Sequence, residues 1–402
     1  MICGLLFFAT TVNYIDRQAL GILKPTLAKD LHWSESDYGW IVSAFQFAYA
    51  LTMPLAGRVV DRLGTRLGYA LAVLVWSTAA MSHSLARTWG QFVAARFGLG
   101  MGESANFPAA IKTVAEWFPE KERALATGIF NSGSNVGAVV APLLIPVVAY
   151  RLGWRAAFLF TGALDLIWLV AWLTYYRKPA TELAVATGGE RWRELLTKRA
   201  AWAYIAGKFV TDPVWWFFLF WIPAFLQSTY QLPLTSLGLP LAAIYVAADA
   251  GSILGGWLSA GMISRGWSLN AARKTAMLLC ACAATPVISL VVVRGLWATV
   301  ALIGLAAAAH QGWSANLYTL VSDTFPRRTV GSVIGLGGLV GGLSGILAAP
   351  AIGYWLDFSG GAYRPLFVVG GMAYLAALGI IQILVPRIAR PVLSPDTALP
   401  LR

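Results

Sequence analysis

Charged residues and cysteines are both scarce in this sequence. Only 12% of its 402 residues are charged, whereas 58% are hydrophobic. A soluble protein of this length needs far more charged surface, so the composition indicates a protein with many membrane-spanning segments. The three cysteines, Cys3, Cys280 and Cys282, lie in apolar stretches. They are too few and too scattered for a disulfide framework or a metal-ligand set, and we expect no cofactor.

Long polar stretches are missing as well, which excludes a separate soluble domain. Apolar runs of about 20 residues, the length needed to cross a bilayer as a helix, recur twelve times. Their approximate positions are 1–23, 38–58, 67–86, 89–113, 124–150, 154–176, 201–227, 236–263, 272–293, 296–321, 329–355 and 364–386. We therefore predict an all-α membrane protein with twelve transmembrane helices.

The net charge of +12 is unevenly placed. No basic stripe with interleaved aromatic residues lies outside the loops, which argues against nucleic-acid binding. Basic residues gather in alternate loops, around Arg58, Lys121, Arg177 and Arg273. This positive-inside asymmetry predicts that both chain ends are cytoplasmic.

The first apolar run begins at Met1 without a basic leader, and Asp16 and Arg17 interrupt it. A cleaved signal peptide is therefore not expected. We expect instead that a short cytoplasmic tail precedes this start in the native protein.

A polar stretch divides the predicted helices six and six. A Phe-Pro step followed nine residues later by glycine occurs at Phe118 and again at Phe325, which indicates a duplication. Six-helix halves related by a repeat are typical of transporters that bind their substrate near the membrane midplane. We predict an N-terminal bundle at 1–178, a cytoplasmic linker at 179–199, a C-terminal bundle at 200–388 and a cytoplasmic tail at 389–402.

Four ionisable residues lie inside apolar runs: Asp16, Arg17, Arg96 and Glu103. A charge at bilayer depth costs at least about 2.5 kcal/mol and persists when it faces a partner or a water-filled path. On helices, Asp16 and Arg17 share a face with Asn13, and Arg96 and Glu103 align two turns apart. These charges could be ion pairs that only hold helices together, or a transport site. Because charges buried only for structure are poor stabilisers, we favour the transport site.

The transport interpretation divides the roles by chemistry. The guanidinium of Arg17 matches a carboxylate with two parallel hydrogen bonds. Asp16 and Glu103 can take up and release a proton, because burial favours the neutral carboxyl group and a nearby guanidinium favours the charged one. Arg96 would compete with the proton for Glu103, which would couple proton binding to transport.

The loop between the second and third apolar runs, Gly57–Arg66, reads GRVVDRLGTR. We expect Gly57 to allow close helix approach and Gly64 to permit a tight reversal. In its residue sequence and in its position between the second and third apolar runs, the loop resembles the signature of the major facilitator superfamily. The resemblance implies a role in conformational gating for Gly57, Asp61, Arg62 and Arg66.

Other stretches resemble a narrower family. Asn13–Arg17 and Arg96–Ser104 are similar to the anion:cation symporter family, whose members move organic anions with protons. Phe130–Asn135, Asp212–Phe217 and His310–Asn316 resemble the bacterial hexuronate transporters.

By this resemblance, Arg17 corresponds to the ligand of the substrate carboxylate, Asp16 and Glu103 to the protonated acids, and Arg96 to the partner of Glu103. Tyr49 corresponds to a tyrosine associated with the substrate. The resemblance implies a proton-coupled symporter that imports a hexuronate such as glucuronate or galacturonate. It also implies a multi-pass monomer in the bacterial inner membrane, with the lipid bilayer, protons and the sugar acid as its partners.

Polar residues near the centre of the predicted helices suit a hydroxylated acid. Gln46 and Tyr49 lie three apart, and Asn131 and Asn135 lie four apart, so each pair shares a helix face. Their donors and acceptors match sugar hydroxyl groups. For the two asparagines, hydrogen bonding between helices is the alternative.

Further candidates are more ambiguous. We predict substrate contacts for Trp216 and for Asn316, although interfacial anchoring or packing explains Trp216 equally well. His310 could relay protons or could be a packed histidine. Asp212 and Asp249 could each take part in gating.

Three alternatives remain open: a symporter of another carboxylate such as galactonate or glucarate, a phosphate-ester exchanger, and a membrane sensor that does not transport. A phosphate-ester exchanger should carry more than one intramembrane arginine free of acidic partners. This sequence does not show that pattern.

Overall fold

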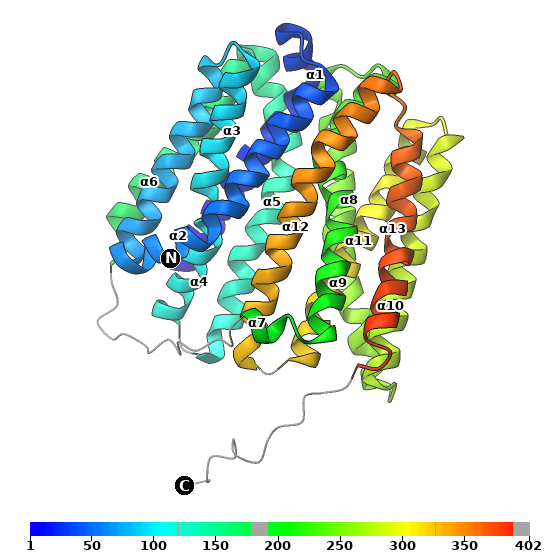
Figure 1. Ribbon diagram of the computed structural model, residues 1–402. Helices are drawn as coiled ribbons and strands as arrows, with labels where there is room; N and C mark the ends of the chain where they lie inside the picture. Colours follow the sequence, from blue (N-terminus) through cyan, green and yellow to red (C-terminus); the bar gives the residue numbers. More distant parts are fainter. Residues whose placement is uncertain (119, 178–191, 326, 389–402) are drawn as a thin grey trace.

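The protein, seen in a computed structural model, is described over residues 1–118, 120–177, 192–325 and 327–388. Within these ranges the side chains of 54, 61, 120–125, 192, 193, 327, 328, 331 and 332 are not described. All secondary structure of the described residues is helical, as the sequence predicts. Long helices run side by side in two groups, drawn blue to cyan and green to red in Figure 1.

The first group comprises α1 (Ile2–Leu31), α2 (Glu35–Ser82), η1 (His83–Leu85), α3 (Trp89–Glu103), α4 (Asn106–Trp117), α5 (Glu120–Leu152) and α6 (Trp154–Tyr175). The second group comprises α7 (Trp192–Leu195), α8 (Arg199–Tyr230), η2 (Leu234–Ser236), α9 (Gly238–Ser264), α10 (Leu269–Ala284), η3 (Thr285–Val291), α11 (Leu296–Thr324), α12 (Arg327–Phe358) and α13 (Arg364–Leu384). Most of the predicted linker 179–199 and the whole predicted tail 389–402 lie outside the described residues. The predicted domain boundaries therefore stay predictions.

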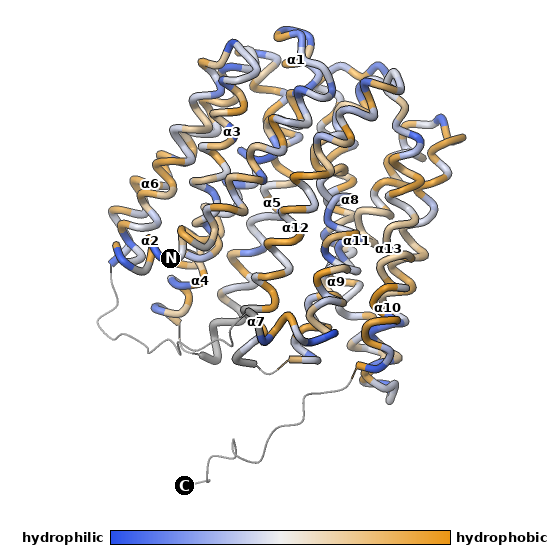
Figure 2. Tube along the Cα trace, in the orientation of Figure 1, coloured by the Kyte–Doolittle hydropathy of each residue, from blue (hydrophilic) through white to orange (hydrophobic). Residues whose placement is uncertain are grey.

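Many large apolar residues of the long helices are exposed, and hydrophobic residues alternate with hydrophilic ones along the helices, whose ends are often hydrophilic (Figure 2). Seven helical segments of the described residues are long and apolar enough to cross a membrane: 126–152, 154–175, 199–230, 234–264, 269–291, 333–358 and 364–384. Helix α1 has 30 residues, roughly 45 Å at 1.5 Å per residue. Its polar residues lower its hydropathy, and the count of twelve crossings stays a prediction.

Helix α2 contains two of the predicted spans, joined at Gly64. Gly64 has a φ of 77° inside an otherwise helical segment, which gives the reversal expected there. The two arms touch at Gly68, where an added Cβ would lie 2.8 Å from the Cα of Val60. The expected close approach at Gly57 is wrong for this conformation, because no atom lies within 4 Å of a Cβ built there.

The charged residues of the Gly57–Arg66 loop differ in their surroundings. Arg66 donates a hydrogen bond to the carbonyl of Leu173 at 2.5 Å and accepts one at its own carbonyl from the Trp172 indole at 3.0 Å. These bonds fasten the turn of α2 to α6. Arg62 is exposed, and the side chain of Asp61 lies outside the described residues. The gating roles of these residues stay predictions.

The two groups meet at the end of the molecule where α1 ends and α2 begins, which we call the closed end. The carboxylate of Asp357, on α12, accepts hydrogen bonds from the backbone N–H groups of Glu35 and Ser36 at 2.9 and 2.7 Å. The Tyr38 hydroxyl donates to the carbonyl of Phe220 on α8 at 2.9 Å. An acceptor at the first N–H groups of a helix stabilises that helix end. Here the acceptor belongs to the other group, so the same bonds hold the two groups together.

Replacing Asp357 with alanine should therefore loosen the closed end. The loss of a capping interaction costs about 1 kcal/mol, enough to shift a two-state equilibrium about fivefold. We expect spin labels on α2 and α12 at the closed end to report a larger population of long distances. Asp37→Ala is the matched control, because the Asp37 carboxylate accepts only from Ser34 of its own group, at 3.0 and 2.8 Å. Equal distance distributions for both variants would contradict this role.

Candidate functional site

A cavity of about 720 Å³ lies between the two groups. Helices α1, α4 and α5 form one wall, and α8, α9, α11 and α12 form the other. The cavity runs from the middle of these helices away from the closed end. Its polar lining residues are Tyr14, Thr127, Asn131, Ser134, Asn135, Lys208, Asp212, Tyr245, Asp249, Ser252, His310, Gln311, Ser314 and Tyr318.

Behind Tyr14, Arg17 forms a buried ion pair with Glu103. The Nη2 and Nε atoms of Arg17 donate to Oε2 of Glu103 at 2.9 and 3.2 Å, and Nη2 also donates to Oδ1 of Asn13 at 3.3 Å. The guanidinium lies 4.8 Å from the ring centroid of Tyr14 and 5.2 Å from that of Tyr49. Such a guanidinium is held by charge, hydrogen bonds and aromatic faces together. The pair joins α1 to the last residue of α3.

Arg96 does not pair with Glu103, contrary to what the family resemblance implies. Its Nη2 donates to the backbone carbonyl of Arg17 at 3.1 Å, and its guanidinium lies 5.0 Å from the Phe45 ring and 6.0 Å from the Phe220 ring. Two helical turns, roughly 10 Å, separate Arg96 from Glu103 along α3. Arg17, on the neighbouring helix, lies level with Glu103 and takes the carboxylate instead.

Asp16 faces a second carboxyl group, that of Asp165 on α6. Both residues are buried, with 2% and 1% of their surfaces exposed, and the Thr161 side chain on α6 also lies beside the Asp16 carboxyl group. Two ionised carboxylates can only accept hydrogen bonds, whereas one proton between them lets one group donate to the other. Sequence reasoning missed Asp165, although an acid within the predicted span 154–176 was a usable signal.

The predicted substrate residues fall into three settings. Asn131, Asn135 and Trp216 line the cavity. Tyr49 lies against the guanidinium of Arg17. Gln46 is buried, and neither polar atom of its amide has a partner among the described residues.

Asn316 differs from its predicted role in this conformation. Its amide nitrogen donates to the carbonyls of Gly255 and Gly312 at 2.8 and 2.9 Å, and the side chain is fully buried. It therefore holds α11 against α9 instead of lining the cavity. A side-chain amide satisfies backbone carbonyls as readily as it binds a hydroxyl, and the sequence does not distinguish the two uses.

The second group contributes its own ion pair to the cavity wall. The ammonium of Lys208 lies 2.7 Å from Oδ2 of Asp212, one turn further along α8. Sequence reasoning singled out Asp212 but missed Lys208, which was visible as a base inside the predicted span 201–227. His310 has the contacts of a packed histidine: it stacks on Trp215 at 5.1 Å, and its Nδ1 lies 2.8 Å from the Tyr374 hydroxyl.

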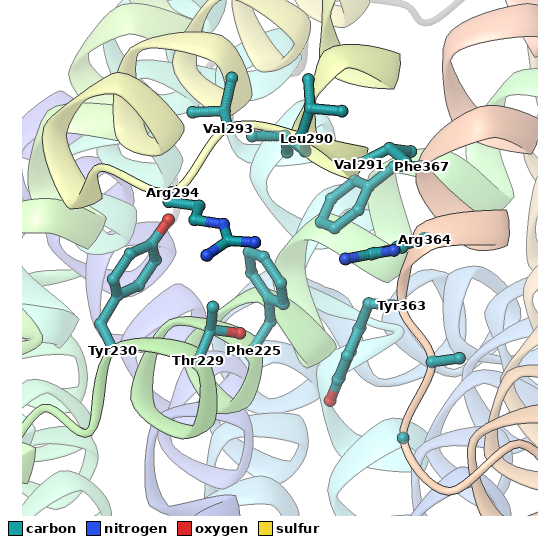
Figure 3. A pocket seen from close by; sticks show the side chains of 13 residues that line it. Phe225, Thr229, Tyr230, Leu290, Val291, Val293, Arg294, Tyr363, Arg364 and Phe367 are labelled. Carbon is teal, nitrogen blue, oxygen red and sulfur yellow. The ribbon is translucent and has the colours of Figure 1, made fainter.

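A second pocket, of about 870 Å³, lies at the closed end within the second group alone. Figure 3 shows the guanidinium groups of Arg294 and Arg364 turned toward the space between the aromatic rings of Phe225, Tyr230 and Tyr363. Both arginines are exposed. Its lining comes from the second group alone, whereas both groups line the cavity described above.

The Arg17–Glu103 pair generates a stability prediction. Removing one partner of a buried pair leaves an uncompensated charge and typically costs about 3–5 kcal/mol. Arg17→Ala should therefore lower the thermal unfolding temperature in detergent markedly, and the double variant Arg17→Ala/Glu103→Ala should recover most of the loss. Asn13→Ala, which removes only the 3.3 Å hydrogen bond, should have a much smaller effect. A double variant as unstable as Arg17→Ala would show that the charges do not depend on each other.

Comparisons with known proteins agree with this architecture. The family model of the Major Facilitator Superfamily matches residues 6–349. The chain is 32% identical to the hexuronate transporter of Escherichia coli K12 over 401 residues, which cover 94% of this chain and 92% of that protein. It is 35% identical to the galacturonate transporter of Dickeya chrysanthemi over 274 residues, 63% of this chain and 79% of that one. The D-galactonate transporter of Escherichia coli O6:H1 is 26% identical over 94% of this chain and 95% of its own length.

Among solved structures, the fold is similar to that of a bacterial homolog of the human lysosomal transporter Spinster, in an inward-facing and unoccupied conformation. The TM-score is 0.78 at 20% sequence identity, covering 96% of this chain and 95% of that one. At that identity the likeness concerns the fold alone.

Proposed function

The chain belongs to the Major Facilitator Superfamily, a family of transporters and not of enzymes, and on that premise we propose that it is a proton-coupled symporter that imports a sugar-acid anion. Hexuronates such as glucuronate or galacturonate are the proposed cargo. The observation that supports this most is the buried Arg17–Glu103 pair beside a polar cavity between two helix groups. Relatives named for hexuronate and galacturonate transport support the choice of substrate.

The coupling follows from competition for one guanidinium. In this conformation the guanidinium of Arg17 donates to Oε2 of Glu103, while Oε1 of Glu103 has no partner among the described residues. A proton on Glu103 would remove its charge and weaken the pair, which frees Arg17 for the carboxylate of the cargo. The cargo and the proton would then favour each other's binding. This reciprocity is what symport requires.

Asp16 and Asp165 would form a second proton-binding element. Two buried carboxylates that face each other repel, and burial adds a desolvation cost to each charge. The pair would therefore hold at least one proton as long as water is excluded from it. Access of water from either side would lower the cost of ionisation. The pair connects α1 to α6, within the group that would rock as one body.

The direction of opening follows from the charge distribution. Arg58, Arg62 and Arg66 lie around the turn of α2 at Gly64, away from the closed end. With the positive-inside bias, that end is cytoplasmic. The closed end would then face outward, and the cavity would open inward. We propose a bacterial inner-membrane location with both chain ends in the cytoplasm.

Three other functions are the alternatives. Relatives named for galactonate transport make another sugar acid the first alternative. A phosphate-ester exchanger is less favoured, because Arg17 and Lys208 each already have an acidic partner. A sensor that does not transport would bind the sugar acid without accumulating it.

Counterflow in proteoliposomes tests the substrate class. Vesicles loaded with unlabelled glucuronate should take up labelled glucuronate, and the exchange should be competed by galacturonate more strongly than by galactonate, glucarate or uncharged glucose. Glucose should compete least because only an acid can replace Glu103 at Arg17, and the order among the acids rests on the relatives named for hexuronate and galacturonate transport. Exchange with none of the acids would end the transport proposal, and stronger competition by galactonate or glucarate would move the cargo to the alternative class.

Proton coupling is tested by Glu103→Gln. The neutral amide resembles the protonated acid, so exchange of glucuronate should persist while accumulation driven by a pH gradient is lost. Asp30→Asn serves as the control, because Asp30 accepts from the Trp154 indole at 3.0 Å, far from the cavity. Gradient-driven accumulation by Glu103→Gln at the native level would remove Glu103 from the coupling mechanism.

A further inference from the structure

The cation that the cavity itself exposes is Lys208 and not Arg17. Among the described residues that line the cavity, Lys208 is the only lysine or arginine. Arg17 lies behind the lining, and its fork is engaged by Glu103. An anion that enters the cavity in this conformation therefore meets the ammonium of Lys208 first.

The surroundings of Lys208 are built around its charge. Its ammonium lies 2.7 Å from Oδ2 of Asp212 and 5.3 Å from the ring centroid of Tyr318 on α11. On α12, Gly341 leaves the room that the pair occupies: an added Cβ would lie 2.0 Å from Oδ2 of Asp212 and 3.4 Å from Cε of Lys208. Three helices thus converge on one ammonium group.

This pair is poorly explained as a structural device. Lys208 and Asp212 lie four residues apart on the same helix, so their contact does not hold two helices together. Pairs of this kind stabilise a helix only slightly, whereas charges at membrane depth are costly. The side chains are 10% and 15% exposed, and both reach the cavity. An intramembrane charge that faces a cavity is a functional-site candidate by default.

The donor count leaves room for a ligand. An ammonium group has three donors; Asp212 takes one, and the Tyr318 side chain is close enough to take a second, which leaves the third for a ligand. Asn131 and Asn135 line the opposite wall of the same cavity. A hydroxylated acid could therefore place its carboxylate at Lys208 and its hydroxyl groups at the amides of the other group.

We propose that Lys208 binds the carboxylate of the transported acid in the conformation that is open away from the closed end, and that Asp212 is the internal anion with which this carboxylate competes. The inference rests on the proposed transport of a sugar acid, and it adds a second carboxylate position in the other helix group. Cargo bound there touches both groups at once. Such cargo can bias their relative movement, which a ligand held by one group alone cannot do.

Binding measurements on the purified full-length protein test this assignment. We compare D-glucuronate with its uncharged methyl ester in the native protein, in Lys208→Met, in Asp212→Asn and in the double variant Lys208→Met/Asp212→Asn. The native protein should prefer glucuronate. In both variants that lack Lys208 we expect at least a tenfold loss of glucuronate affinity and little change for the ester. Asp212→Asn should bind glucuronate as tightly as the native protein or more tightly.

The double variant separates binding from folding, because it removes both charges and leaves no uncompensated acid. Lys274→Met is the matched control: Lys274 binds Gln382 and the carbonyls of Val385 and Pro386 outside the cavity, and its loss should leave glucuronate affinity unchanged. If the double variant keeps the native preference for glucuronate over the ester, Lys208 only neutralises Asp212 and the inference fails while the proposed transport stands. If the native protein binds none of the sugar acids, the proposed function fails and the inference with it.

Discussion

A guanidinium and a carboxylate that meet inside a membrane protein must satisfy each other, because neither lipid nor bulk water can do it. Arg17 and Glu103 meet in this way, between the middle of α1 and the end of α3. Aromatic rings close the remaining faces of the guanidinium, and Arg96 reaches the backbone of Arg17 from the same helix as Glu103. This contact joins α1, which lines one wall of the central cavity through Tyr14, to the end of α3. Under the proposed function, a substrate carboxylate or a proton would replace this contact and so act on the wall that α1 forms.

The two helix groups are in contact on one side of this central ion pair and apart on the other. At the closed end, α2 and α12 share backbone and side-chain hydrogen bonds, and a glycine-mediated approach brings Gly39 against Ala349. Away from it, the groups separate around the cavity. The closed end thus combines hydrogen bonds with close backbone packing, at Gly39 against Ala349 and at Gly353 against Glu35 and Ser36.

The charges of the cavity are arranged in pairs that belong to different groups. Arg17 and Glu103, with Asp16 and Asp165 nearby, lie in the first group, while Lys208 and Asp212 lie in the second. Each ion pair lies within its own group, so the groups can move past each other without separating either pair. A ligand that exchanges into either pair would be the element that links them.

Local chemistry determined much of this in advance. The apolar runs predicted helices whose bounds differ from α5, α6, α9 and α13 by only a few residues, since length and hydropathy depend on neighbouring residues alone. The reversal at Gly64 was predictable for the same reason. The intramembrane positions of Asp16, Arg17, Arg96 and Glu103 also identified the polar centre, because ionisable residues stand out against an apolar background.

What only the tertiary structure decided is which of these groups face each other. Periodicity orders residues along one helix, but the level and rotation of one helix against the next follow from packing at glycines and aromatic residues far apart in the sequence. For that reason Glu103 meets Arg17 instead of Arg96, Asp16 meets Asp165, and Asn316 fastens α11 to α9. The same packing turns Lys208 toward the cavity and leaves Arg17 behind it. The sequence determined that opposite charges lie at the centre, and only the fold decided how they are paired.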